Sequence, residues 1–395
     1  MHGRKKWTTV FCLLVMGLLW LGGCGSPSSG FGESIPSESE SEALVFDHSM
    51  DLQYAENFAV DYYEGGYKLL SIFDGTRIFI VPEGKETPKD LEEGIIVLKA
   101  PVRNLYLVSS AVMDCFRELD ALETIRLSGQ KAENWYIPEA TEAMQKGDIL
   151  YAGKYNKPDY ELIVSEQCTL AIENRMITHS PEVVEMLEHF DIPVMVEYSS
   201  YESHPLGRVE WVKFFGALVD KEEEADRIFA KQASILEKVS AAEKTDKTDK
   251  TDKTDKTVAF FYITSTGYAQ VRQKSDYIPK MIELAGGQYI FHDLGDSETN
   301  RSTMNMQIEE FYDKAKDADY IVYNSSIDGG VQSVEELLDK CPVLKDFKAV
   351  EEGNVWCTTN DMYQQSMSIG YLIEDFHEML RGEGEENMDY LFRLE

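Results

Sequence analysis

Polar and aromatic side chains follow the ends of several predicted strands, where they could hold a small molecule. They are Ser109, Ser110, Trp135, Tyr136, Arg175, Tyr201, Tyr268, Arg272 and Asn324. In doubly wound sheets, ligands bind in the crevice beyond the carboxyl ends of the strands. Aromatic rings offer flat apolar faces there, and guanidinium groups attract anions. These residue types therefore predict a cleft for a bulky, anionic small-molecule ligand.

The chain lacks the common catalytic motifs. H-E-x-x-H, G-x-S-x-G, Walker A and G-x-G-x-x-G do not occur. Ser128 and Lys131 match S-x-x-K, but the K-T-G partner is absent, because every Lys-Thr lies in one repeat and is followed by Asp or Val. The spacing of His and Cys suits no structural zinc site. We therefore predict a binding protein rather than an enzyme, with no catalytic residue, no metal site and no cofactor.

The elements that must position these residues alternate between strands and helices. A hairpin comes first, since β-rich runs at 67–72 and 77–81 flank the turn dipeptide Asp74-Gly75. Apolar runs then predict strands at 105–108, 123–127, 169–172, 193–196, 258–263, 320–323 and 355–357. Helical patterns lie between them at 111–121, 139–145, 159–166, 181–190, 277–284, 307–315 and 363–380. This alternation predicts an α/β fold with mainly parallel sheets that are covered on both faces.

A long helical region separates the two α/β halves. Apolar stripes at 206–219 and 225–242 predict two consecutive helices with no strand between them. A charged Lys-Thr-Asp repeat without apolar residues follows and predicts a solvated loop. We therefore predict two lobes joined by a long helix. Their limits are 51–204 for the N-terminal lobe, 205–243 for the connecting helices, 244–257 for the repeat loop and 258–395 for the C-terminal lobe.

The N-terminus has the features of a lipoprotein signal. Cationic residues 4–6 precede an apolar run at 10–21, which is too short to span a hydrocarbon core of about 30 Å. Leu21-Gly22-Gly23-Cys24 matches a lipobox, so 1–23 is predicted to be a signal peptide and Cys24 the lipidated residue. Residues 24–50 would form the anchor and a flexible tether. We thus expect a lipid-anchored chain on the extracytoplasmic face of the cell membrane; the alternative is an uncleaved anchor or a chance cysteine.

Composition narrows the range of partners. The formal net charge of −33 argues against nucleic-acid binding, because that binding depends on Lys and Arg at phosphates. We expect a monomer. Cys115, Cys168, Cys341 and Cys357 have isolated spacings, and we expect buried free thiols, although export would also permit disulfides.

Several segments resemble one family of transport proteins. They lie at 158–164, 170–172, 201–211, 285–287, 308–312 and 318–324, and 201–211 reads Y-E-S-H-P-L-G-R-V-E-W. From about residue 56 onward, the chain resembles the cobalamin, haem and iron-siderophore class of ABC transporter substrate-binding proteins, the class III periplasmic binding proteins. The resemblance implies two Rossmann-like lobes, a rigid connecting helix and a ligand cleft between the lobes. The N-terminal hairpin and the Lys-Thr-Asp repeat depart from the family pattern.

The resemblance also implies partners. An ABC permease with its ATPase would receive the ligand, and one glutamate of each lobe would dock onto permease arginines. By position these are Glu161 and Glu309, with Glu310 a neighbouring candidate. The alternative is that each is an acid in the first turn of a helix, where the macrodipole favours it.

The leading ligand is a ferric-siderophore-like chelate. Haem or cobalamin is the runner-up, because Met176 and His179 follow a strand end and both side-chain types can ligate haem iron. Ordinary packing and helix capping are the preferred explanation for that pair. From other classes, the alternatives are a lipid-anchored enzyme and a sensor or adhesin with the same fold.

Overall fold

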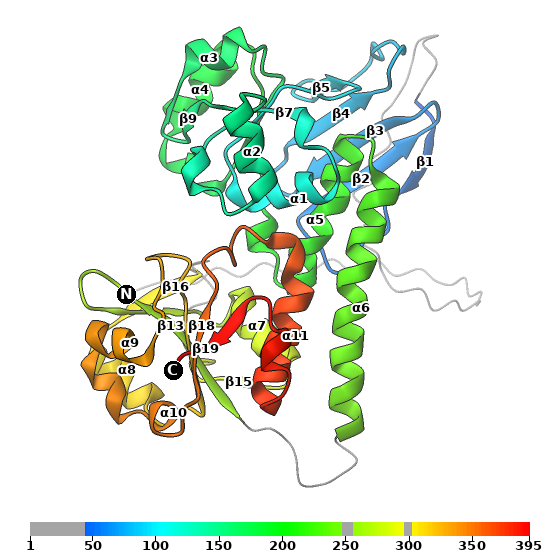
Figure 1. The fold of residues 1–395 in the computed structure, drawn as a ribbon. Coiled ribbons are helices and arrows are strands. Elements are labelled where there is room, and N and C mark those ends of the chain that lie inside the picture. Colours follow the sequence, from blue (N-terminus) through cyan, green and yellow to red (C-terminus); the bar gives the residue numbers. More distant parts are fainter. Residues whose placement is uncertain (1–43, 247–255, 296–301) are drawn as a thin grey trace, which may run out of the picture. The chain divides into compact units, whose positions relative to one another are not determined.

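The computed structural model describes residues 44–246, 256–295 and 302–395 (Figure 1). The predicted signal peptide, Cys24 and residues 247–255 of the repeat lie outside these ranges. No helix within the described ranges is both long and apolar enough to cross a membrane. We call the described residues up to 204 the N-terminal half and those from 256 onward the C-terminal half. One large apolar core receives side chains from both halves, such as Phe116 and Phe376, and Phe215 packs in it from the helix between them.

A five-stranded sheet opens the N-terminal half. Its strand order is β1-β2-β3-β4-β5, antiparallel except for the last pair. The predicted hairpin is confirmed, because Leu70 faces Ile78 across β3 and β4. Gly75 has a φ of 95° in its turn, a left-handed conformation that favours glycine. The strands are β1 (Phe46–Ser49), β2 (Phe58–Tyr63), β3 (Tyr67–Ile72), β4 (Arg77–Val81) and β5 (Ile96–Lys99).

The second sheet of this half is fully parallel, as the alternation predicted. Its order is β12-β11-β6-β7-β8. Leu170 and Ile172 of β11 enter the large core, whereas Ala171 enters a smaller core on the other face. The strands are β6 (Leu105–Leu107), β7 (Ile125–Ser128), β8 (Leu150–Tyr151), β11 (Leu170–Glu173) and β12 (Val194–Val196). The helices are α1 (Met113–Glu118), α2 (Pro138–Lys146), α3 (Tyr160–Ser165) and α4 (Pro181–His189), and a small ribbon pairs β9 (Gly153–Lys154) with β10 (Lys157–Pro158).

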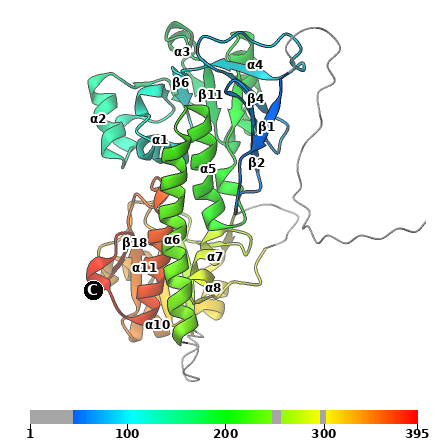
Figure 2. The ribbon, with the colours of Figure 1, turned by 90° about the vertical axis from the view of Figure 1, so that its right-hand side faces the viewer.

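Two adjacent helices follow the N-terminal half in the sequence and precede the C-terminal half. They contact elements of both halves. Helix α5 (Pro205–Leu218) is buried at every residue and packs against β2, β3, α1, α7 and α11. Helix α6 (Glu222–Asp246) lies along α5 and also contacts α7 and α11 (Figure 2). This arrangement is consistent with the predicted connecting helix. Helix α6 includes Lys244–Asp246 of the repeat, because extending an existing helix avoids the cost of nucleation.

The sheet of the C-terminal half is mixed rather than mainly parallel. Strands β15, β13, β17 and β18 are parallel neighbours, while β14, β16 and β19 add antiparallel edges. The short turn after β13 permits only an antiparallel partner, which is why the expected parallel pattern fails there. The strands are β13 (Thr257–Ile263), β14 (Ala269–Arg272), β15 (Gln288–Tyr289), β16 (Thr303–Met306), β17 (Tyr320–Tyr323), β18 (Val355–Thr358) and β19 (Leu391–Arg393). The helices are α7 (Tyr277–Leu284), α8 (Ile308–Ala315), α9 (Val334–Lys340), α10 (Lys348–Glu351) and α11 (Ile369–Arg381).

The four cysteines outside the signal and lipobox are buried and free, as expected from their spacing. Burial raises the pKa of Cys168 and Cys357 to about 11. Both thiols are therefore protonated at neutral pH, which disfavours reaction and metal binding.

Candidate ligand-binding site

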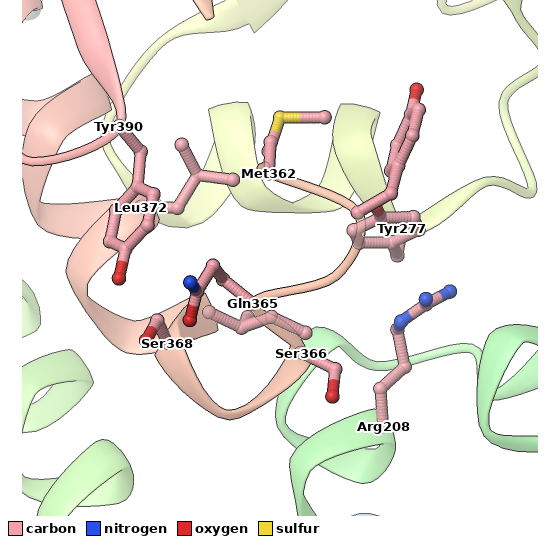
Figure 3. Close-up of a pocket in the computed structure, with 10 residues that line it drawn as sticks. Arg208, Tyr277, Met362, Gln365, Ser366, Ser368, Leu372 and Tyr390 are labelled. Atoms are coloured by element: carbon pink, nitrogen blue, oxygen red, sulfur yellow. The ribbon is translucent and has the colours of Figure 1, made fainter. Parts of the chain in front are cut away.

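A small pocket lies where α5 meets α7 and the segment before α11 (Figure 3). It encloses about 10 Å³, measured as space for the centre of a water molecule, which admits one water-sized group. Its lining combines one guanidinium, hydroxyl, amide and apolar groups, and contains no acidic residue. The lining residues are Arg208, Tyr277, Met362, Tyr363, Gln365, Ser366, Ser368, Ile369, Leu372 and Tyr390.

Most of the Y-E-S-H-P-L-G-R-V-E-W segment holds the N-terminal strands in place. The Glu202 carboxylate accepts hydrogen bonds from the backbone N–H groups of residues 56 and 57 and from Trp211 Nε1. The fully buried Glu210 carboxylate accepts from the N–H groups of residues 53, 54 and 55. His204 stacks on Tyr54 with ring centroids 4.3 Å apart. These contacts explain the two glutamates, the histidine and the tryptophan by folding alone.

Arg208 is the member of that segment that faces the pocket. Its side chain comes from the first turns of α5, and the residue is only 7% exposed. The guanidinium carbon lies 3.8 Å from the centroid of the Tyr277 ring, which belongs to α7 in the C-terminal half. Its Nη atoms donate only to the carbonyl and hydroxyl of Ser200, at 3.2 and 3.3 Å. Its Nε has no hydrogen-bond partner among the described residues.

Two of the predicted residues of the C-terminal half meet at Tyr363. The Arg272 guanidinium lies 5.2 Å from the centroid of that ring, and Asn324 Nδ2 donates to its hydroxyl at 2.8 Å. Arg272 also pairs with Asp276 at 3.5 Å. Tyr277 lies near the charges of both Arg208 and Arg272, although burial is the main effect and raises its pKa. Arg208 and Arg272 therefore each lie against an aromatic ring, Tyr277 and Tyr363 respectively.

Arg175 and Tyr201 also meet, at the surface of the N-terminal half. The Arg175 guanidinium carbon lies 4.8 Å from the centroid of the Tyr201 ring. Tyr198 and Phe73 continue this aromatic surface, with centroids 4.5 Å apart, and Phe73 is 57% exposed. We call these four residues the aromatic ledge. Its residue Tyr201 directly follows Ser200, which accepts two hydrogen bonds from Arg208 of the pocket.

Three predicted residues of the N-terminal half use their polar groups within the chain. Ser109 donates its hydroxyl to buried Glu197 at 2.6 Å, and Trp135 Nε1 donates to Ser128 Oγ at 3.3 Å. Tyr136 keeps an exposed ring, but its backbone N–H donates to Gln364 of the C-terminal half at 2.8 Å. Ser109 and Trp135 are buried, so neither offers its polar group to a ligand.

The remaining predicted residues lie in a turn, in short 3-10 helices and at strand ends. Ser110 is partly buried at the start of a short 3-10 helix. Tyr268 lies in the turn after β13, where its N–H donates to Thr264 Oγ1. Asn324 follows the neighbouring β17, so both occupy the carboxyl ends of parallel strands. Met176 and His179, the haem-ligand alternative, are exposed in one 3-10 helix beside Arg175.

The two candidate docking acids lie in the first turns of α3 and α8. Glu161 and Glu309 are exposed, and Glu310 is exposed as well. Their apolar neighbours Ile163 and Phe311 are fully buried, as the sequence predicts. Their docking role stays a prediction.

Sequence reasoning missed Arg208, Tyr277, Tyr363, Tyr198 and Phe73. Arg208 lies inside a helix rather than after a strand, so the strand-end rule could not select it. Its signal in the sequence was a cation near the start of a mostly apolar helix that also contains Glu210 and Lys213. Phe73 had a weaker signal, as an aromatic residue beside the Asp74-Gly75 turn.

Comparisons with curated proteins agree with the predicted signal peptide and lipid anchor. No protein-family model matches the chain. An uncharacterized lipoprotein of Methanocaldococcus jannaschii is 26% identical over 347 residues, covering 79% of this chain and 77% of that protein. A second uncharacterized lipoprotein of the same organism is 24% identical over 356 residues, with coverages of 87% and 86%.

Solved structures define the class of fold. A periplasmic heme binding protein from Pseudomonas aeruginosa aligns with a TM-score of 0.57 and 12% identity, over 74% of this chain and 98% of its own. A possible iron-binding, periplasmic solute-binding protein from Staphylococcus epidermidis gives 0.54 and 13%, over 71% and 99%. An ABC-type Fe3+-hydroxamate transport system from Saccharomonospora viridis gives 0.53 and 18%, over 71% and 93%. The chain therefore has the two-lobe α/β fold of class III periplasmic binding proteins, which confirms the fold predicted by the sequence resemblance.

Proposed function

We propose that this chain is the extracytoplasmic solute receptor of an ABC importer, and that it binds an iron chelate between its two halves. The observation that carries the proposal is the meeting of Arg208 with Tyr277 beside the aromatic ledge. One partner comes from helix α5 and the other from the C-terminal half, so a ligand there would contact both. The shared fold with solute-binding proteins supports the same role.

The ligand class follows from the chemistry of the surfaces. Exposed rings at Tyr201 and Phe73 suit a large flat or apolar chelate, and Arg175 suits negative charge. A ferric-siderophore-like chelate fits both features, and the named relatives include a Fe3+-hydroxamate transport system. Haem is the second candidate, because exposed Met176 lies beside Arg175 and another relative is a heme binding protein.

Delivery of the ligand completes the proposed role. Lipidation at Cys24 would hold the receptor on the outer face of the membrane, where an ABC permease and its ATPase could accept the solute. Exposed Glu161 and Glu309, one on each half, would contact cationic residues of the permease. Such exposed charges govern the rate and orientation of encounter more than raw affinity.

A thermal-shift screen of the mature chain, from Cys24 onward in detergent, tests the proposed function. The probes are ferric siderophores, haemin and cobalamin, each measured with wild type and with the exposed control Arg227→Gln. Binding only to the folded state adds about 2.7 kcal/mol at a hundredfold excess over Kd. We expect at least one iron chelate to raise the melting temperature of both proteins equally. No shift with any probe would overturn the proposal.

A further inference from the structure

Arg208 differs from the other buried cations of the chain. Within the described ranges, the buried lysine and arginine residues are Lys68, Arg208, Lys213 and Arg272. Lys68, Lys213 and Arg272 each form an ion pair with at least one carboxylate. Arg208 pairs with no carboxylate of the described residues; its contacts are Ser200 and the Tyr277 ring. A buried charge without a counter-ion is costly. The described residues supply no anion for this guanidinium, so an anion from outside the fold would stabilise it.

The geometry indicates from which side an anion can reach Arg208. The Tyr277 ring covers one face of the guanidinium, and the two Nη atoms are directed to Ser200. The Nε atom is buried and has no partner among the described residues, which leaves the Nε edge as the unsatisfied donor. One carboxylate oxygen can accept two hydrogen bonds at such an edge, one from Nε and one from the adjacent Nη, and a single oxygen is the size of group that the pocket admits. Those Nη bonds to Ser200 are long enough to be exchanged for a stronger, charge-assisted bond.

The size of the pocket limits what can enter. A cavity of about 10 Å³ admits one water-sized group and not a whole chelate. The aromatic ledge begins at Tyr201, next to Ser200, and offers exposed rings outside the pocket. A ligand can therefore rest its apolar body on the ledge and direct one short anionic arm toward Arg208.

We propose that Arg208 and its pocket form a subsite for a carboxylate arm of the solute. The inference rests on the proposed function and narrows it, because it selects chelates that carry a free carboxylate over neutral ones. Tyr277 is the positioning residue, since its ring holds the guanidinium between the halves. A carboxylate bound there would neutralise the one buried lysine or arginine of the described residues that has no ion-pair partner, in a pocket lined by both α5 and α7.

The test compares probes with and without a free carboxylate. Haemin carries two propionate carboxylates, and haemin dimethyl ester has the same ring with both esterified. Ferric citrate and the neutral hydroxamate ferrichrome form a second pair. Binding of each to the mature chain is measured for wild type, Arg208→Gln, Arg208→Lys and the exposed control Arg227→Gln. Arg227 is 64% exposed on α6 and undergoes the same change of charge.

We expect Arg208→Gln to lose about tenfold to a hundredfold of the affinity for the carboxylate-bearing probe, as one charge-assisted pair is lost. Arg208→Lys keeps the charge without the two-bond edge, and its affinity for the same probe should fall several-fold. Arg227→Gln should bind as wild type does. Without ligand, Arg208→Gln should melt at an equal or higher temperature, because it removes an unpaired buried charge. This last readout separates the subsite from a structural role, for which the melting temperature would fall.

Each remaining outcome contradicts the subsite. If wild type binds haemin or ferric citrate and Arg208→Gln binds it equally well, Arg208 is not the anchor. If wild type binds only ferrichrome or the dimethyl ester, the proposed function stands and the carboxylate subsite is wrong. If wild type binds none of the four probes, the carboxylate subsite is overturned, while the proposed function is decided by the wider thermal-shift screen. If Arg208→Gln fails to fold, the Arg208→Lys affinity decides, and an affinity equal to wild type rejects the two-bond geometry.

Discussion

Replacing Glu210 with Gln should destabilise the whole N-terminal half. The carboxylate is fully buried and accepts hydrogen bonds at 2.8–3.1 Å from three consecutive backbone N–H groups, at residues 53–55. It also pairs with Lys213 at 3.4 Å. An amide has only one acceptor oxygen and directs its NH₂ group at donors, so some of these donors become unsatisfied.

The magnitude follows from what remains buried after the change. Each unsatisfied donor costs about 1–3 kcal/mol, and breaking one side of a buried ion pair costs about 3–5 kcal/mol. Lys213 keeps its contact with Asp226 at 3.5 Å, which lowers the total. We therefore expect Glu210→Gln to lose about 3–5 kcal/mol of unfolding free energy, against less than about 0.5 kcal/mol for the exposed control Glu223→Gln.

Urea denaturation of the unliganded chain, followed by circular dichroism, measures this difference. The comparison uses wild type, Glu210→Gln and Glu223→Gln under the same conditions. A loss below about 1 kcal/mol for Glu210→Gln would refute the reasoning, since the buried donors would then have to find other partners at little cost.

Three further substitutions test separate parts of the account. Burial raises the pKa of Glu173 to about 8 from 4.5, and neither carboxylate oxygen has a hydrogen-bond partner among the described residues. Glu173 thus keeps a proton in the folded state that it releases in the unfolded state; its own contribution to stability is complete below pH 4.5 and is lost toward pH 8, by roughly 3 kcal/mol at pH 7. Glu173→Gln should remove this slope in urea titrations at several pH values, and an unchanged slope would contradict the assignment. Cys24→Ala should abolish fatty-acid labelling in cells while leaving the melting temperature of the folded part unchanged; equal label on mutant and wild type would reject the lipobox. Glu161→Ala and Glu309→Ala should each keep solute affinity and lower uptake, with the double variant more impaired; normal uptake by the double variant would reject the docking role.

Strand and helix alternation could be predicted because it depends on local apolar runs. The hairpin at β3 and β4 and the parallel order around β11 follow from periodicity and turn residues. Strand β1 is exposed at all four residues and leaves no apolar signature in the sequence. The antiparallel edges β14, β16 and β19 are short, and their partners are set by tertiary packing rather than by their own composition.

The candidate site was harder to predict, because it depends on contacts between distant residues. Of the strand-end residues, Arg175 lies against Tyr201 at the surface, whereas Arg272 and Asn324 are buried beside Tyr363. The strand-end rule cannot tell toward which side a residue faces. Ser109 and Trp135 therefore looked available, although buried partners occupy their polar groups. In the segment 201–211, Glu202 and Glu210 bind backbone groups about 150 residues away in sequence, which no local pattern reveals.

The most direct test of the central claim is a calorimetric titration of the mature chain with the chelate that gives the largest thermal shift. The claim is that one solute binds between the halves and contacts both. We expect saturable binding of about one ligand per chain, weakened at least about tenfold both by Tyr201→Ala in the N-terminal half and by Tyr363→Ala, at the pocket, in the C-terminal half. Saturable binding that neither substitution changes would contradict the claim, as would the absence of saturable binding.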